Sequence, residues 1–192
     1  MKRLLFWALI YMNLCYLNTT GGMESANGNE QSVIAYIYYK EGRMKDLLDP
    51  QDNRKIIERI GKLLPSAQAQ WGTMHVAQML AHTQMLLRCA FGEVKYKRSL
   101  LGIFVGRIAL KKLTSGEPWK HSMPTNTGFV VADEREFEKE KKQLVSLVKR
   151  FTQSGPSAIT KEAHPFFGKM NPQEWSSLQW NHLNHHLTQF GV

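Results

Sequence analysis

The sequence predicts an all-α protein, a bundle of four long helices with a shorter amphipathic helix between the second and the third. Three observations support this fold class. Apolar residues recur at helical spacing in five segments, and residues that cap or stop helices flank them. The β-prone patch at 34–39 has no partner strand in view. A chain of 192 residues is also long enough to bury one substantial core.

The first two helices follow from their boundary residues. The Asp-Pro pair at 49–50 starts the first helix and Pro65 stops it. Thr73 is expected to cap the second helix, which ends at Gly92. His82 is expected to be buried, because it shares a face of that helix with apolar neighbours, whereas Gln84 should lie away from that face. The face comprises His75, Met79, His82, Leu86 and Cys89.

The next two segments differ in character. Residues 95–113 combine basic and apolar side chains, and their apolar part is too short to span a bilayer. We expect residues 98–113 to cover the open end of the bundle, as a pocket wall or a dimer contact rather than a membrane-binding element. Asp133 is expected to begin the third long helix, which ends before the Gly-Pro pair at 155–156.

The last helix has a clear start signal. Asn171 can cap it, Pro172 suits its first position, and Glu174 stands where a capping box places its acid. At about 100° per residue, one broad face carries Trp175, Gln179, Leu183, His186, Leu187 and Phe190. The opposite face carries Ser177, Asn181, Asn184 and Thr188.

Histidines on this helix suggest a metal site. His182 and His186 are four residues apart, so their imidazoles point the same way and can hold one ion. No Glu follows His182, which excludes the protease form of this pattern. His82 is the candidate third ligand. Three neutral imidazoles around Zn²⁺ or Ni²⁺ leave a position open for water or a substrate thiolate. The alternative is that these are helix-face histidines with no special role.

Five further residues are candidates for the surroundings of the site. Gln78 and Gln189 could donate hydrogen bonds to the ligand imidazoles, or simply pack. His185 lies towards the polar side of its helix and suits a supporting or surface position. His75 is too far along its helix to share the ion with His82. It could line the pocket mouth, or pack in the core or at its rim, which is the favoured interpretation. His164, in a His-Pro-Phe-Phe loop, could approach the substrate, or the loop could plug the bundle end. No catalytic residue can be named.

The charge pattern argues against nucleic-acid binding. The net charge is +9, of which residues 44–192 carry +8. The basic residues of 134–142 alternate with acidic ones, which indicates a solvated, self-paired helix face. No nucleic-acid-binding motif is present, so a nucleic-acid or anionic-surface binding module is the least favoured function. Cys15 and Cys89 do not resemble a disulfide framework.

Residues 1–43 differ from the rest. Two basic residues precede an apolar run at 4–16, as in a secretory signal, but no small-x-small cleavage site follows promptly. The codons of residues 40–42 can contain a purine-rich ribosome-binding sequence of the bacterial kind just before Met44. We therefore expect either a mis-assigned leader with a cytoplasmic protein starting at Met44, or a signal or tethered extension on an exported protein.

Residues 44–192 resemble the DinB/YfiT-like superfamily, and within it an uncharacterised family of unknown function. The stretches that carry the resemblance include Trp-Gly-Thr-Met-His-Val-Ala-Gln-Met-Leu-Ala-His and the terminal His-Leu-Asn-His-His-Leu-Thr-Gln-Phe-Gly. In full, they lie at 71–82, 97–102, 129–135, 164–169 and 182–191. The resemblance implies a four-helix bundle, commonly dimeric, with one metal-binding histidine on the second helix and two on the last. The matching positions are His82, His182 and His186.

Characterised members of that superfamily include thiol-dependent S-transferases and a maleylpyruvate isomerase. The resemblance therefore implies a metal-dependent transferase or isomerase acting on a small molecule, with a low-molecular-weight thiol as a possible second cofactor. A non-catalytic metal-binding or scaffold bundle is the alternative.

Overall fold

A computed structural model describes residues 44–121 and 130–192, which form five α-helices and one 3-10 turn but no β-strand. The helices are α3 (Pro50–Lys62), α4 (Val76–Ala90), α5 (Leu100–Leu113), α6 (Phe137–Ser154) and α7 (Pro172–Gln189), and the turn η2 (Pro156–Ala158) follows α6. The all-α prediction is confirmed for these residues. The expectations for residues 1–43, including the β-prone patch and Cys15, lie outside the described part.

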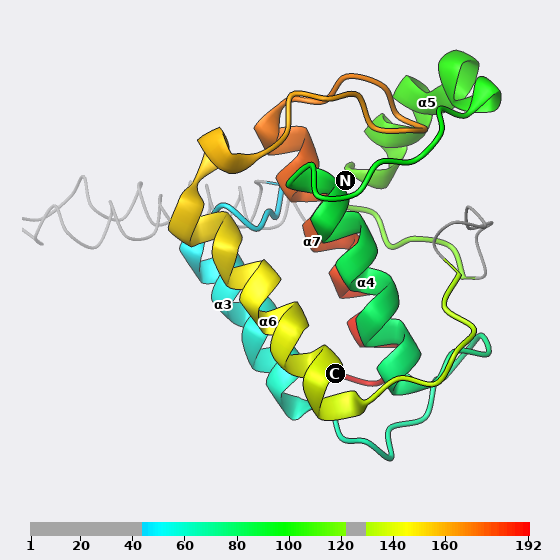
Figure 1. Cartoon of the computed structure of the whole chain (residues 1–192), viewed down its shortest axis with the longest axis vertical. Coiled ribbons are helices and arrows are strands. Elements are labelled where there is room, and N and C mark those ends of the chain that lie inside the picture. Colours follow the sequence, from blue (N-terminus) through cyan, green and yellow to red (C-terminus); the bar gives the residue numbers. More distant parts are fainter. Residues whose placement is uncertain (1–43, 122–129) are drawn as a thin grey trace, which may run out of the picture. The chain divides into compact units, whose positions relative to one another are not determined.

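Four of the helices pack in a ring (Figure 1). Helix α6 contacts α3 and α4 on one side, and α7 contacts the same two helices on the other. Helix α5 contacts α7 and lies at the end of the ring where α7 begins. The ring encloses the apolar core, whose largest fully buried side chains are Trp175, Phe151, Leu47, Ile56, Ile60, Leu63, Met79, Leu80, Leu87, Leu110, Leu144 and Leu178.

Several helix ends lie where the local signals predict them. Asn171 Oδ1 accepts a hydrogen bond from Glu174 N at 2.8 Å, and Glu174 Oε2 accepts one from Asn171 N at 2.9 Å. This capping box confirms the predicted start of α7. Asp49 caps α3 by accepting from two backbone N–H groups of the first turn. Gly155 ends α6 with a φ of 66°, a conformation that favours glycine.

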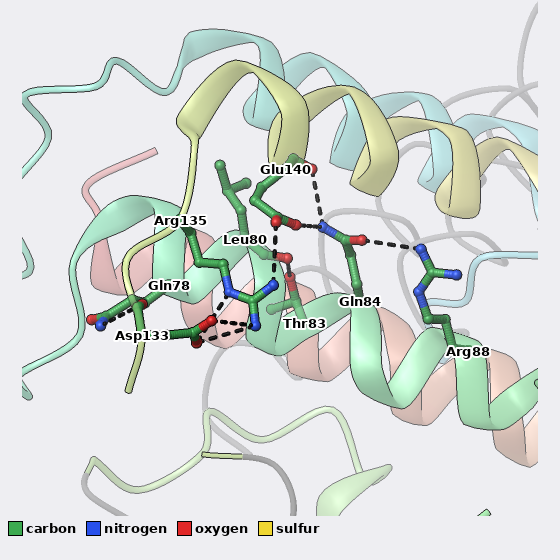
Figure 2. Close-up of polar contacts among 8 residues, drawn as sticks. All are labelled: Gln78, Leu80, Thr83, Gln84, Arg88, Asp133, Arg135 and Glu140. Carbon is green, nitrogen blue, oxygen red and sulfur yellow. Dashed lines mark hydrogen bonds and ion pairs between the residues drawn. The ribbon is translucent and has the colours of Figure 1, made fainter. Parts of the chain in front are cut away.

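Two predicted helix starts are wrong. His75, not Thr73, precedes α4, and its backbone N–H donates to Gln78 Oε1 at 3.0 Å. Helix α6 begins four residues after Asp133. The carboxylate of Asp133 pairs with Arg135 at 3.0 Å, and its carbonyl accepts from Gln78 Nε2 at 3.3 Å (Figure 2). These contacts tie the segment before α6 to the start of α4, so Asp133 does not act as a cap.

A buried polar contact joins α4 to α6 (Figure 2). Glu140 is only 5% exposed, and its carboxylate accepts from Gln84 Nε2 at 2.7 Å. The same amide donates to the Glu140 carbonyl at 3.1 Å, and Arg135 lies 3.6 Å from the carboxylate. Gln84 is therefore buried, contrary to its expected position away from the buried face. The helical pattern missed it because the partner of Gln84 is polar.

Helix α7 is buried on more sides than its pattern predicts. Ser177 and Asn181, expected on the outer face, are buried, as is Ser176. The α3, α4 and α5 helices all contact α7, which leaves no broad side free. Ser176 Oγ donates to Asp46 at 3.0 Å and accepts from Leu48 N at 2.8 Å. Polar residues on α7 thus bind the segment that leads into α3.

The prediction of a helix between the second and third long helices is confirmed by α5, but with 14 residues α5 is not shorter than α3, which has 13. None of the helices in the described ranges is long and apolar enough to cross a bilayer.

Candidate metal centre

Three histidines converge between α4 and α7. His82 lies mid-way along α4, and His182 and His186 lie one turn apart on α7. The Nε2 atoms of His82 and His182 are 3.1 Å apart, and the three ring centroids are separated by 4.7 to 5.1 Å. One nitrogen of each ring lies within 4.8 Å of the other two. These three side chains are therefore close enough to hold one metal ion.

Burial favours the neutral form of two of the imidazoles, those of His182 and His186. All three rings are at least nine-tenths buried. Burial, reinforced by the neighbouring His186 and His82, lowers the pKa of His182 well below its usual value. Burial, with His82 as the next cause, lowers the pKa of His186 to about 3. A neutral imidazole keeps a lone pair on one nitrogen, which is the form that binds a metal ion.

A glutamine fixes the orientation of His186. Gln189 donates from Nε2 to the carbonyl of Trp71, so its Oε1 is the atom that faces His186 Nδ1 at 2.8 Å. An amide oxygen only accepts, and Nδ1 of His186 must therefore carry the proton. The lone pair then lies on Nε2, as in metal sites where a hydrogen bond sets the tautomer. Gln189 therefore contacts a candidate ligand, but it accepts the hydrogen bond instead of donating it as expected.

The donor set fits a divalent ion. The cluster contains histidines only, and three neutral nitrogen ligands suit zinc or nickel. Two Nε2 atoms facing each other at 3.1 Å can share at most one proton between them. His182 Nδ1 is buried and has no hydrogen-bond partner among the described residues. Burying this nitrogen of His182 without a partner carries a free-energy cost.

Two tryptophans and a histidine line one side of the cluster. Trp119 stacks on His182 with ring centroids 5.8 Å apart, and its Nε1 donates to Leu113 O at 2.9 Å. Trp71 stacks on His121 at 3.8 Å. His185 is half-buried between the two tryptophans, 5.6 Å from Trp71 and 5.8 Å from Trp119. The sequence analysis did not assign Trp71, Trp119 or His121 to the site.

Two of the suggested surrounding residues lie elsewhere. His75 is exposed at the start of α4. Gln78 makes its hydrogen bonds to the backbone of His75 and of Asp133. These bonds stabilise the start of α4 and hold the segment that precedes α6.

His164 lies near the opposite end of α7. Its ring is 5.2 Å from that of Trp175, which precedes His182 by seven residues, or ~10 Å along the helix. His164 Nδ1 accepts from the backbone N–H groups of Phe166 and Phe167 at 3.0 and 3.1 Å, and its ring stacks on Phe167. These contacts agree with the interpretation of the loop as a plug at the end of the bundle.

His164 should make stability depend on pH. Burial lowers its pKa to about 4 in the folded protein, against about 6.5 in an unfolded chain. The unfolded chain therefore binds the extra proton as the pH falls from 6.5 to 4, and the free energy of unfolding falls by on the order of 3 kcal/mol. In His164→Asn, which retains an acceptor near the position of Nδ1, this share of the pH dependence should disappear. Denaturant unfolding of metal-free protein at several pH values measures it.

In metal-free protein, His182 and His186 contribute equally to the pH dependence of stability in the wild type and in His164→Asn. If the free energy of unfolding of His164→Asn depended on pH as steeply as that of the wild type, burial of His164 would not be the source of this pH dependence.

Comparison with known proteins places most of the chain in one family. The family model described as a protein of unknown function (DUF1569) matches residues 43–191. Neither a curated protein nor a solved structure matches the chain.

Proposed function

Because the chain belongs to the DUF1569 family of proteins of unknown function, its role must be argued from the site, and we propose a divalent-metal-dependent enzyme. The observation that carries this proposal is the convergence of His82, His182 and His186 as buried neighbours. Together they supply three neutral ligands to Zn²⁺ or Ni²⁺. An ion held this way keeps a coordination position for a substrate atom or water, where it can lower the pKa of a bound nucleophile or polarise an oxygen.

The reaction class rests on resemblance as well as geometry. The ring of four long helices and the division of the histidines, one on α4 and two on α7, support placing the chain among DinB-like bundles. Within that group we propose a transferase or isomerase acting on a small molecule, with a low-molecular-weight thiol as co-substrate. A homodimer is part of the same proposal. The protein's own contribution would be to fix three imidazoles and to cover one side of the ion with Trp119.

One observation favours a second candidate, a non-catalytic metal-binding bundle. The three histidines are each less than 10% exposed, and aromatic rings cover one side of them. A closed site of this kind would bind an ion for structure alone.

Substitution with Co²⁺ distinguishes the two candidates. The visible absorption of bound Co²⁺ reports its ligands directly. For an open enzyme site, adding 2-mercaptoethanol should produce a thiolate-to-cobalt charge-transfer band, and azide should alter the spectrum as well. If the spectrum with Co²⁺ bound at the three histidines responds to neither ligand, the enzyme proposal fails and the closed bundle stands.

Gln189 should tune the affinity for the ion. Replacing it by leucine removes the acceptor for His186 Nδ1, so the ring is free to turn or change tautomer. We expect the dissociation constant for Zn²⁺ to rise by about 10- to 100-fold, the usual effect of losing such a partner. Competition with a chromophoric chelator measures it. Gln179→Leu is the matched control, since its amide bonds the Leu86 carbonyl instead; equal effects of the two variants would refute the role of Gln189.

A further inference from the structure

Helix α5 exposes an apolar face. Phe104 is 82% exposed, Leu100 78% and Ile108 74%, although such side chains are usually buried. Nine large apolar residues of the described ranges are exposed, and six of them lie on this one helix: Leu100, Leu101, Ile103, Phe104, Val105 and Ile108. An apolar patch of this kind usually marks an interaction site.

The opposite face of α5 fixes this orientation. A Cβ added at Gly102 or Gly106 would lie 2.4 or 2.2 Å from the backbone oxygen of Phe166, so these glycines let the helix pack directly on the 164–168 loop. Arg107 donates to Glu174 at 2.7 Å and to the Lys169 carbonyl at 2.9 Å. With its glycine face against the protein and Leu110 buried on the same side, α5 turns its other large apolar side chains outward, except for the partly buried Leu113.

The charges around the patch are of one sign. Residues 94–116 contain six Lys and Arg and no Asp or Glu. Lys97 and Arg98 lie just before the apolar residues and Lys111 and Lys112 just after them, and all four are exposed. Pairing with α5 of a second copy would bring basic ends together, whether the two helices ran parallel or antiparallel. An anionic surface complements both the charge and the apolar face.

We propose that α5 docks the protein on an anionic lipid surface, lying in the interface plane with Phe104, Leu101 and Ile108 inserted and the flanking basic residues on the head groups. Fourteen residues form a helix of about 21 Å, which suits an interfacial element and is too short to cross a bilayer. This inference departs from the sequence-based expectation of a pocket wall or dimer contact.

A site-specific fluorophore tests this docking in the full chain. Phe104→Cys in a Cys15→Ser background carries an environment-sensitive label. Cys89 reacts slowly because it is buried and burial raises its pKa to about 11. Leu64→Cys, at a leucine outside α5 that is 63% exposed, is the control. This design separates α5 docking from attachment through the apolar run at 4–16, which would not bring the label at 104 into lipid.

Vesicles of phosphatidylserine and phosphatidylcholine should shift the emission of the label at 104 to the blue, with little change at 64. Vesicles of phosphatidylcholine alone should have a much smaller effect. Reversing Lys111 and Lys112 to Glu should weaken the response more than about 20-fold in lipid concentration, since each basic residue near such a surface contributes roughly fivefold. Reversing the charges of Lys142 and Lys149 on α6, as a matched control, should not weaken the response.

Three results would overturn the proposal. An equal shift at 64 and 104 would mean attachment through another part of the chain. A blue shift at 104 that grows with protein concentration without vesicles would assign the face to a second copy. If vesicles did not change the emission of the label at 104, the apolar face of α5 would instead bind a protein partner.

Discussion

Replacing His182 by alanine should weaken the binding of Zn²⁺ or Ni²⁺ by more than about 100-fold. Losing a hydrogen-bond partner of a ligand already costs 10- to 100-fold, and His182 is proposed to supply one of only three protein ligands. Its ring centroid lies 5.1 Å from that of His82 and 4.7 Å from that of His186, and its Nε2 is 3.1 Å from that of His82. Titration with a competing chelator gives the affinity, and circular dichroism shows whether the helices persist. We expect them to persist, because the helices share a substantial apolar core of their own.

His185→Ala is the matched control for this variant. His185 is on the same helix, contacts His186 edge to face, and is half-buried, but it is not part of the three-histidine cluster. Its removal should change metal affinity by less than about tenfold, as for a residue that only lines a site. If His185→Ala lost the ion as completely as His182→Ala, the choice of ligands would be wrong.

Replacing Gly106 by alanine should destabilise the protein by about 3 kcal/mol and loosen α5. The new Cβ would lie 2.2 Å from the Phe166 carbonyl oxygen, and a backbone atom cannot move aside as a flexible side chain can. Overpacking of this kind typically costs 1–3 kcal/mol, and the close contact with backbone places this site at the upper end. Denaturant unfolding measures the loss.

Gly61→Ala provides the opposite expectation in the same chain. Gly61 is inside α3, and nothing lies within 4 Å of an added Cβ. Alanine there should stabilise the protein by about 0.5–1 kcal/mol, the usual gain in helix propensity. Equal effects at the two glycines would refute the close packing of α5 on the 164–168 loop.

Local signals predicted much of this fold. The start of α7 follows from Asn171 and Glu174, which are three residues apart and need no distant partner. The metal-binding candidates were predictable for a similar reason, since four-residue spacing places His182 and His186 on one side of a helix. Bringing His82 to them required the pairing of α4 with α7, which the resemblance implied and the spacing alone did not.

The errors arose where distant residues decide the outcome. Ser177 and Asn181 read as an outer face because the pattern assumes one buried side, whereas α7 has neighbours on several sides. Gln84 is buried by its hydrogen bond to Glu140, 56 residues away. Trp119 reaches the histidines from a loop, and no spacing rule connects a loop tryptophan to a helix. The outward face of α5 depends on the backbone of Phe166, a contact that periodicity does not reveal.

We propose that His82, His182 and His186 bind one divalent ion. Elemental analysis of protein purified without an affinity tag, with X-ray absorption at the edge of the metal found, tests this claim most directly. We expect about one zinc or nickel per chain, coordinated by three imidazole nitrogens at about 2.0–2.1 Å, and no stoichiometric metal in the variant His82→Ala. Wild-type protein that retains no metal after incubation with either ion, or that binds it equally well without His82, would contradict the claim.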